Sequence, residues 1–316
     1  MLGPPLGGFI TTHAGWRWIF FLNLPLGAVA LLASLFVIPD AREAPARRFD
    51  AKGFALCGIG TFAFLLGLDR GTEGIDWPSL GCLLTGGLLL GLAVRHLRCC
   101  SAPLVDLHAF SIPTFRAALR GGSVSRMAIS SAPFLLPLMF QVGFGYDAFH
   151  SGLLVLAVFA GNLGMKSITT PILQRFGYRP VMIVNGLLCA VTLALCAVLD
   201  PHTPIALTIL ILTTSGMTRS MQFTVLGTIA YADVPKAQMS DANSLFNTLT
   251  QVSMAAGITL AALSVRASHG LVEHLGIELP GAEYRLAFLL VALVSLCGLF
   301  DAVRLPRGAA DHFISR

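Results

Sequence analysis

Charged residues are scarce in this sequence. Asp, Glu, Lys and Arg make up 12% of its 316 residues, whereas hydrophobic residues make up 55%. A soluble domain carries roughly 25% charged residues. The composition therefore excludes an ordinary soluble domain and indicates a membrane protein, with the lipid bilayer as its first partner.

Uninterrupted apolar runs recur along the whole chain. About 20 helical residues, rising 1.5 Å each, cross a hydrocarbon core of about 30 Å. The runs lack the period-two alternation of a lipid-facing β-strand, so helices are expected. We predict an all-α, polytopic membrane helix bundle with nine spans, at residues 17–38, 53–69, 79–97, 117–141, 151–170, 180–199, 203–229, 242–265 and 284–304.

The segment before the first span is short and uncharged. As a helix, residues 1–12 would reach only about 18 Å, too little to cross a bilayer. No basic residue precedes Arg17, so the segment does not match a cleaved signal peptide. We expect it to be a stub at the outer side.

Basic residues are distributed unequally between the two ends of the spans. Of 21 Lys and Arg residues, fourteen fall on one side, four on the other and three within spans. The positive-inside rule makes the richer side cytoplasmic, and with it the carboxy terminus. The richer side holds Arg42, Arg47, Arg48, Lys52, Arg95, Arg98, Arg116, Arg120, Arg175, Arg179, Lys236, Arg304, Arg307 and Arg316.

Several signatures of other protein classes are missing. The seven cysteines form no CxxC pair and no histidine cluster accompanies them, so we expect buried, inert thiols and no metal site. The stretch "GMKS" lacks the spacing of a phosphate loop, so no nucleotide cofactor is expected. No set of nucleophile and base indicates an enzyme. Because the net charge of +5 resides mainly in the connections, nucleic acid is not an expected partner.

The predicted spans fall into unequal groups. Residues 1–38 hold the stub and first span, and residues 39–53 form a cytoplasmic linker rich in charge and proline. An inserted helix pair occupies 54–98, followed by a cytoplasmic connection at 99–116. Six spans with short connections form a carboxy-terminal bundle at 117–304, and a cytoplasmic tail follows at 305–316.

Two adjoining motifs near the start resemble a known family. "GPPLGG" combines small residues, which allow close helix contacts, with prolines that bend helices. Followed by "WRWIFFLNLPLG", it resembles the antiporter motif of drug:proton antiporters of the major facilitator superfamily, closest to the fourteen-helix group of the EmrB and QacA type. The motif and gating residues implied are Gly3, Pro4, Pro5, Gly7, Gly8, Trp16 and Arg17.

Later segments follow the same family order. They include "RRFDAKG", "PLVDLHAF", "GYDAFHSGLLVLA" and "ILQRFGYRP". "GNLGMKS", together with "GMTRSMQFTVLGTIAYADVP" and "DANSLFNTLTQVSMAAGI", looks most like the multidrug-resistance protein D (MdtD-like) branch. By this resemblance, residues 1–38 are a remnant of the amino-terminal bundle, namely the end of family helix 5 and helix 6.

The resemblance implies a function. A family member would export drug-like, anionic or chelate solutes across the inner (plasma) membrane by proton antiport with alternating access. The chain would then be amino-terminally truncated, without the family's first four helices. The alternative is an inactive remnant, or a half-transporter subunit that needs a separate amino-terminal half.

Three cations fall within predicted spans. Arg126 shares a helix face with Ser123 and Ser130. Two further groups complete these substrate-cavity candidates: Asn162 with Lys166, and Arg219 with Gln222. All sixteen Asp and Glu residues lie in loops or near span ends, so the cations favour an anionic ligand. Snorkelling of long side chains to the interface is the alternative, and it suits Arg126 least because of its depth.

A polar stripe begins another predicted span. Asn243, Asn247 and Gln251 recur every four residues, and lipid would not tolerate them. We expect the stripe to face protein or a wet cavity. Hydrogen bonding between helices and lining of a substrate cavity both remain open.

The stretch "ILQRFGYRP" resembles the second copy of the superfamily's inner signature loop. Arg175, Gly177 and Arg179 are its candidate latch residues. Their cationic side chains can meet carbonyl groups at helix C-termini or an acidic partner. Ordinary positive-inside charge is the alternative reading.

Overall fold

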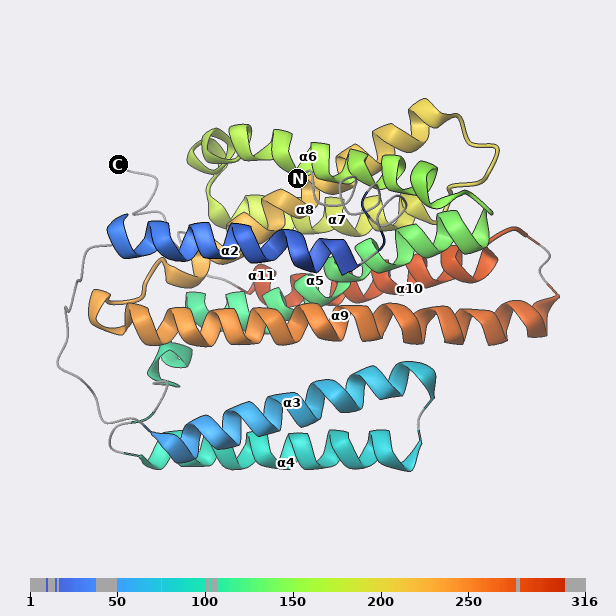
Figure 1. The fold of residues 1–316 in the computed structure, drawn as a ribbon. Helices are drawn as coiled ribbons and strands as arrows, with labels where there is room; N and C mark the ends of the chain where they lie inside the picture. The colour runs from blue at the N-terminus through green and yellow to red at the C-terminus, as the bar shows by residue number, and fades with distance from the viewer. Residues whose placement is uncertain are drawn as a thin grey trace.

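The computed structural model of the chain is built from helices packed side by side (Figure 1). The part of the chain that it describes contains no β-strand, which confirms the predicted all-α class. It describes residues 10, 15, 17–37, 50–74, 76–100, 103, 107–276 and 279–304.

Nine long helices coincide with the nine predicted spans. They are α2 (Arg17–Val37), α3 (Ala51–Glu73), α4 (Trp77–Cys99), α5 (Pro113–Leu138), α6 (Ala148–Phe176), α7 (Tyr178–Cys196), α8 (Ile205–Tyr231), α9 (Met239–Leu275) and α10 (Ala282–Cys297). Short turns η1 (Leu107–Ser111), η2 (Met139–Gly143), η3 (Lys236–Gln238) and the short helix α11 (Leu299–Val303) complete the described elements.

Seven of these helices, among the described residues, are long and apolar enough to cross a membrane. The remaining two are α8 and α10. Helix α10 has 16 residues and continues after Gly298 as α11, whereas α8 carries many Ser and Thr residues along with Arg219. Both are helical where a span is predicted, and their crossing of the membrane stays a prediction.

Helix boundaries differ from the sequence prediction in several places, most clearly between α6 and α7 and at the end of α9. The expected loop between residues 170 and 180 is reduced to Gly177, whose φ of 79° ends α6 directly before α7. Helix α9 runs for 37 residues to Leu275, ten residues beyond the predicted limit of the span at 265, and Gly276 caps it. Glycine in the left-handed region is a common helix terminator, and no proline interrupts α9 before it.

Close helix contacts in the bundle of α5 to α10 depend on glycines. A side chain at Gly161 of α6 would collide with the carbonyl of Thr213 on α8, and one at Gly216 of α8 with the carbonyl of Val158 on α6. Small residues that let backbones approach in this way are typical of membrane helix interfaces. These two glycines therefore hold α6 and α8 in direct backbone contact.

Helices α3 and α4 form an antiparallel pair that lies beside α9 (Figure 1). Gly67 and Gly86 let the two backbones approach each other closely. Each helix begins at an aspartate cap: Asp50 accepts from the backbone N–H of Gly53, and Asp76 from that of Ser79. Two helices are therefore present where an inserted pair is predicted, and their status as an insertion stays a prediction.

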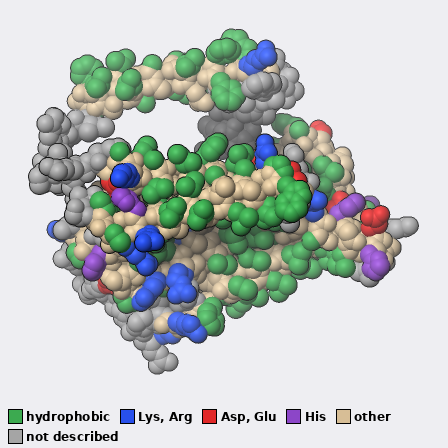
Figure 2. All heavy atoms as spheres, turned by 90° about the horizontal axis from the view of Figure 1, so that it is seen from below, with side chains coloured by type: hydrophobic (Ala, Val, Ile, Leu, Met, Phe, Trp, Pro, Cys, Tyr) green, Lys and Arg blue, Asp and Glu red, His purple; other side chains and the backbone are tan. Residues whose placement is uncertain are grey.

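The molecular surface is apolar over much of its area. Figure 2 shows hydrophobic side chains spread over the helix faces in view, with Lys and Arg gathered mostly towards one end. Helix α2 exposes nearly all its side chains in this chain. Exposed apolar surface on this scale is that of a protein surrounded by lipid or by further helices.

Candidate functional site

A layer of buried polar side chains crosses the middle of the bundle. It consists of Ser125, Arg126, Asn185, Thr218 and Gln222, which we call the polar layer. One apolar core cluster lies towards the α5 N-terminus, around Phe115 and Ile229, and a second lies towards its C-terminus, around Phe140 and Phe288. Substrate sites of transporters built from helical repeats lie near this depth.

Arg126 is the charged member of the polar layer. Its side chain is 1% exposed. Nη1 donates to the carbonyl of Ala118 at 3.1 Å, and the guanidinium carbon lies 4.5 Å from the centre of the Phe246 ring. Gly122, one turn earlier on α5, leaves room for the guanidinium group, because a side chain at this position would crowd Nη1. Nη2 is buried and makes no hydrogen bond in the structure.

The two serines expected to accompany Arg126 do not bind it in the structure. Ser130 is buried with a hydroxyl that has no hydrogen-bond partner, and Ser123 is half-buried. Arg126 is deeply buried, and its place in a substrate cavity stays a prediction. The helices around it are closed in this conformation.

A chain of contacts joins Arg126 to the predicted polar stripe on α9. The Phe246 ring packs 5.2 Å from that of Tyr231. The Tyr231 hydroxyl donates to Asn243 Oδ1 at 2.9 Å, and Asn247 donates to the same oxygen at 3.0 Å. Tyr231 thus connects α8 with the stripe, a role that sequence reasoning missed because tyrosine is common near span ends.

The outer surface of α9 carries the stripe. Asn243, Asn247 and Gln251 are all exposed in the structure, and the expectation that they face protein or a wet cavity stays a prediction. Tyr231 supplies one hydrogen bond between helices, at Asn243. The lining of a substrate cavity stays a prediction for all three.

Helices α7 and α8 share a buried amide pair. Asn185 donates to Gln222 Oε1 at 2.8 Å and to the carbonyl of Thr218 at 2.9 Å. Sequence spacing grouped Gln222 with Arg219, but its described partner is Asn185, on another helix. Asn185 was missed, although an asparagine within the apolar run "VMIVNGLLCA" is a detectable signal.

The other two predicted cations have different surroundings. Arg219 is half-buried beside the Phe223 ring, 5.7 Å away, and borders a cavity of about 20 Å³ that Pro133 and Ser215 also line. Such a cavity holds about one water molecule. Lys166 is exposed and Asn162 half-buried on α6. The structure therefore does not place all three cations around a common cavity.

A larger cavity lies near the far end of α5, where sequence reasoning predicted none. It has a volume of about 700 Å³ and is lined by aromatic side chains together with Asp147, His150 and Asp200. Its volume falls within the range for small-molecule pockets. Its lining comes from two segments that are distant in sequence: residues 140–154, from η2 to the start of α6, and residues 199–209, from the α7–α8 connection to the start of α8.

The predicted latch residues surround the short turn between α6 and α7. Arg179 Nη2 donates to the carbonyl of Val303 at 2.8 Å, so it does meet a carbonyl at a helix C-terminus. Arg175 is exposed over the Phe176 ring. A gating role for Arg175, Gly177 and Arg179 stays a prediction.

Most of the antiporter-motif residues lie outside the described residues: Gly3, Pro4, Pro5, Gly7, Gly8 and Trp16. Arg17 is exposed in the first turn of α2.

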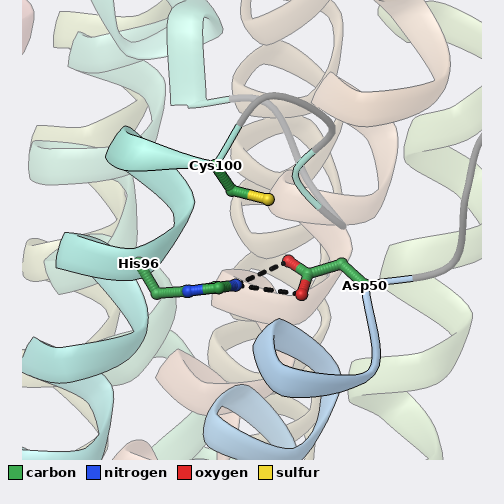
Figure 3. A group of neighbouring side chains, drawn as sticks. All are labelled: Asp50, His96 and Cys100. Carbon is green, nitrogen blue, oxygen red and sulfur yellow. Dashed lines mark hydrogen bonds and ion pairs between the residues drawn. The ribbon is translucent and has the colours of Figure 1, made fainter.

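The cysteines correct one sequence expectation. All seven are free, but only Cys189 and Cys196 are buried, so the expectation of buried thiols is wrong for the others. Cys100 lies beside Asp50 and His96, with one ligand atom from each within 4.8 Å of the others (Figure 3). Sequence reasoning missed this cluster, because 46 positions separate Asp50 from His96.

The helical fold with a polar layer at its centre is that of a membrane transporter bundle. The family model described as Major Facilitator Superfamily matches residues 1–258, and the chain belongs to that superfamily. Two relatives, each named "Putative multidrug resistance protein MdtD", show the branch. One from Pectobacterium carotovorum is 35% identical over 83% of this chain and 57% of its own length. One from Salmonella paratyphi A is 32% identical over 99% of this chain and 67% of its own length. The chain thus spans between about half and two thirds of these relatives' length.

Proposed function

We propose that the protein takes part in proton-coupled export of small molecules by alternating access. Membership of the superfamily and the names of the relatives support this proposal. Proteins of this class are generally transporters and not enzymes. The substrates we propose are drug-like or anionic solutes, including metal chelates.

The observation that carries the proposal is the burial of Arg126. A charge within a membrane bundle costs several kcal/mol unless it meets water, a partner or a ligand. Arg126 has one hydrogen bond, one aromatic contact and a buried Nη2 without a partner. In a transporter of this family, a buried guanidinium group can bind substrate, because a rocking motion that opens the bundle would expose it to a solute.

The charge of the bundle interior supports an anionic substrate. Among the residues of α5 to α10 and their connections whose burial the structure describes, no Asp or Glu is buried, whereas Arg126 is. An anion that reached the polar layer would find a cation with a free donor. Arginine also presents several donors in a planar arrangement that suits carboxylates.

We also propose the inner membrane as the location, with the basic end of the bundle in the cytoplasm. Helix α4 ends and α5 begins at this end, where Arg95, Arg98, Arg116 and Arg120 are exposed. Figure 2 shows Lys and Arg side chains gathered mostly towards one end. The positive-inside rule assigns such an end to the cytoplasm.

Replacement of Arg126 tests the transport proposal. In inverted membrane vesicles, a pH-sensitive dye follows proton release when candidate anionic and cationic drugs are added. We expect Arg126→Ala to lose the flux driven by anionic substrates, because the buried donor is gone. Arg120→Ala, which removes an exposed arginine from the same helix, should retain it.

The outcomes separate the alternatives. Equal flux in both variants would remove Arg126 from the substrate path. Flux with cationic drugs alone would refute the anionic preference. No flux from the unmodified chain would favour the alternative in which it is an inactive remnant, or a subunit that works only beside a separate amino-terminal half.

A further inference from the structure

The basic ends of α3 and α4 bring three metal-binding side chains together. Asp50 is the residue before the first turn of α3, His96 lies in the last turn of α4, and Cys100 directly follows α4. Figure 3 shows the imidazole of His96 and the thiol of Cys100 directed towards the Asp50 carboxylate. This cluster lies apart from the polar layer, and the transport proposal makes no use of it.

The geometry of the cluster is compact. His96 Nε2 lies 2.9 and 3.2 Å from the two carboxylate oxygens of Asp50. The three ligand atoms, one from each residue, lie within 4.8 Å of one another, and all three residues are half-buried. Zinc bonds of about 2.0 to 2.3 Å place tetrahedral ligand atoms roughly 3.3 to 3.8 Å apart. A side-chain movement of about 1 Å would therefore bring the ligands into place.

The backbone holds the three side chains in position. The Gly53 N–H donates to Asp50 Oδ1 at 2.8 Å and orients the carboxylate. The Cys100 N–H donates to the carbonyl of His96 at 2.9 Å, which keeps the last helical turn closed. His96 and Cys100 are thus four residues apart on one helix face, a spacing that presents two ligands to one ion.

The donor set selects the kind of ion. Magnesium and calcium prefer oxygen ligands, whereas imidazole and thiolate favour zinc and related transition metals. A carboxylate and a thiolate together balance the charge of a divalent cation. We propose that Asp50, His96 and Cys100 bind one Zn²⁺-class ion, which joins the start of α3 to the end of α4. A fourth ligand position stays open to water.

Cobalt substitution in the purified full chain tests the proposal. Co²⁺ bound to a thiolate gives a charge-transfer band in the near ultraviolet. We expect the band in the unmodified protein and in Cys99→Ser, since Cys99 is an exposed neighbour outside the cluster. Cys100→Ser should lose the band, and zinc should bind it more than about tenfold less tightly, as expected when a metal site loses a supporting group.

A second measurement needs no variant. Saturating Zn²⁺ should protect Cys100, but not Cys99, from maleimide, as read by mass spectrometry of the labelled peptide; Mg²⁺ should protect neither. A Co²⁺ band of equal size in Cys100→Ser would overturn the assignment, as would equal labelling of the two cysteines in zinc. Either result would mean that Asp50 and His96 form only a hydrogen-bonded clamp between two helices.

Discussion

The contact between α6 and α8 gives a sharp test of the packing. Gly161 and Gly216 face each other's helix so closely that an added methyl group would meet a backbone carbonyl, from Thr213 and Val158 respectively. A backbone atom cannot move aside as a flexible side chain can. Gly161→Ala therefore requires the two helices to separate.

The structure also sets the size of the effect. Excess volume in a packed interior typically costs about 1–3 kcal/mol. Alanine in place of glycine gains up to about 1 kcal/mol of helix propensity, which offsets part of that cost. Gly164→Ala on the same helix is the matched control, because nothing lies within 4 Å of an added Cβ there. The two variants should therefore differ by about 1–3 kcal/mol, with Gly161→Ala less stable.

Thermal unfolding in detergent measures this difference. A thiol-reactive dye added after the five accessible cysteines have been blocked reports unfolding, because Cys189 and Cys196 are buried and become reactive only when the chain unfolds. Each kcal/mol corresponds to about 2–4 °C in Tm for chains of about 150–250 residues, and to a somewhat smaller shift for a longer chain such as this one. Gly216→Ala on α8, with Gly227→Ala as its control, should repeat the pattern. Equal Tm values for Gly161→Ala and Gly164→Ala would refute the close contact of the two helices.

Two further predictions concern polar contacts. Gln222→Leu leaves the buried Asn185 amide with one acceptor fewer, so it should lower stability by about 1–3 kcal/mol in the same unfolding assay. The double variant Asn185→Leu/Gln222→Leu removes both partners and should recover part of that loss. An equal or larger loss in the double variant would contradict the pairing. Asp147 accepts a hydrogen bond from the backbone N–H of His150, and this bond lowers the pKa of Asp147. The contribution of the Asp147 carboxylate to stability should be complete above its unfolded pKa of about 3.9. It should be lost as the pH falls through the lowered pKa of the folded state. Asp147→Asn should remove this acid-dependent part from a pH series of Tm values, and an unchanged pH dependence would show that the cap does not act in this way.

The helices themselves were predictable from local sequence. Apolar runs about as long as a bilayer is thick leave the backbone no alternative to helical hydrogen bonds, so nine long helices form where nine spans were expected. Interruptions were harder to place. Gly177 separates α6 from α7 within a single residue, and α9 continues past its apolar stretch, since a helix does not end where its hydrophobic surface ends.

The candidate sites were predictable only in part. Arg126 stands out in the sequence as a cation within an apolar run, and the structure adds that Phe246 from α9 covers it. The partnership of Gln222 with Asn185 depends on how α7 packs against α8. Spacing along one helix could not reveal a partner on another.

The sequence by itself determined the class, the helices, the concentration of positive charge at one end and the family, because each is encoded by neighbouring residues or by motifs. Only the tertiary structure decided which polar groups meet. It buried Arg126 in a closed layer, left the α9 stripe exposed and placed Asp50 beside His96 and Cys100. The physical reason is that the pairing of α3 with α4, and of α5 with α9, brings together side chains that are distant in the chain.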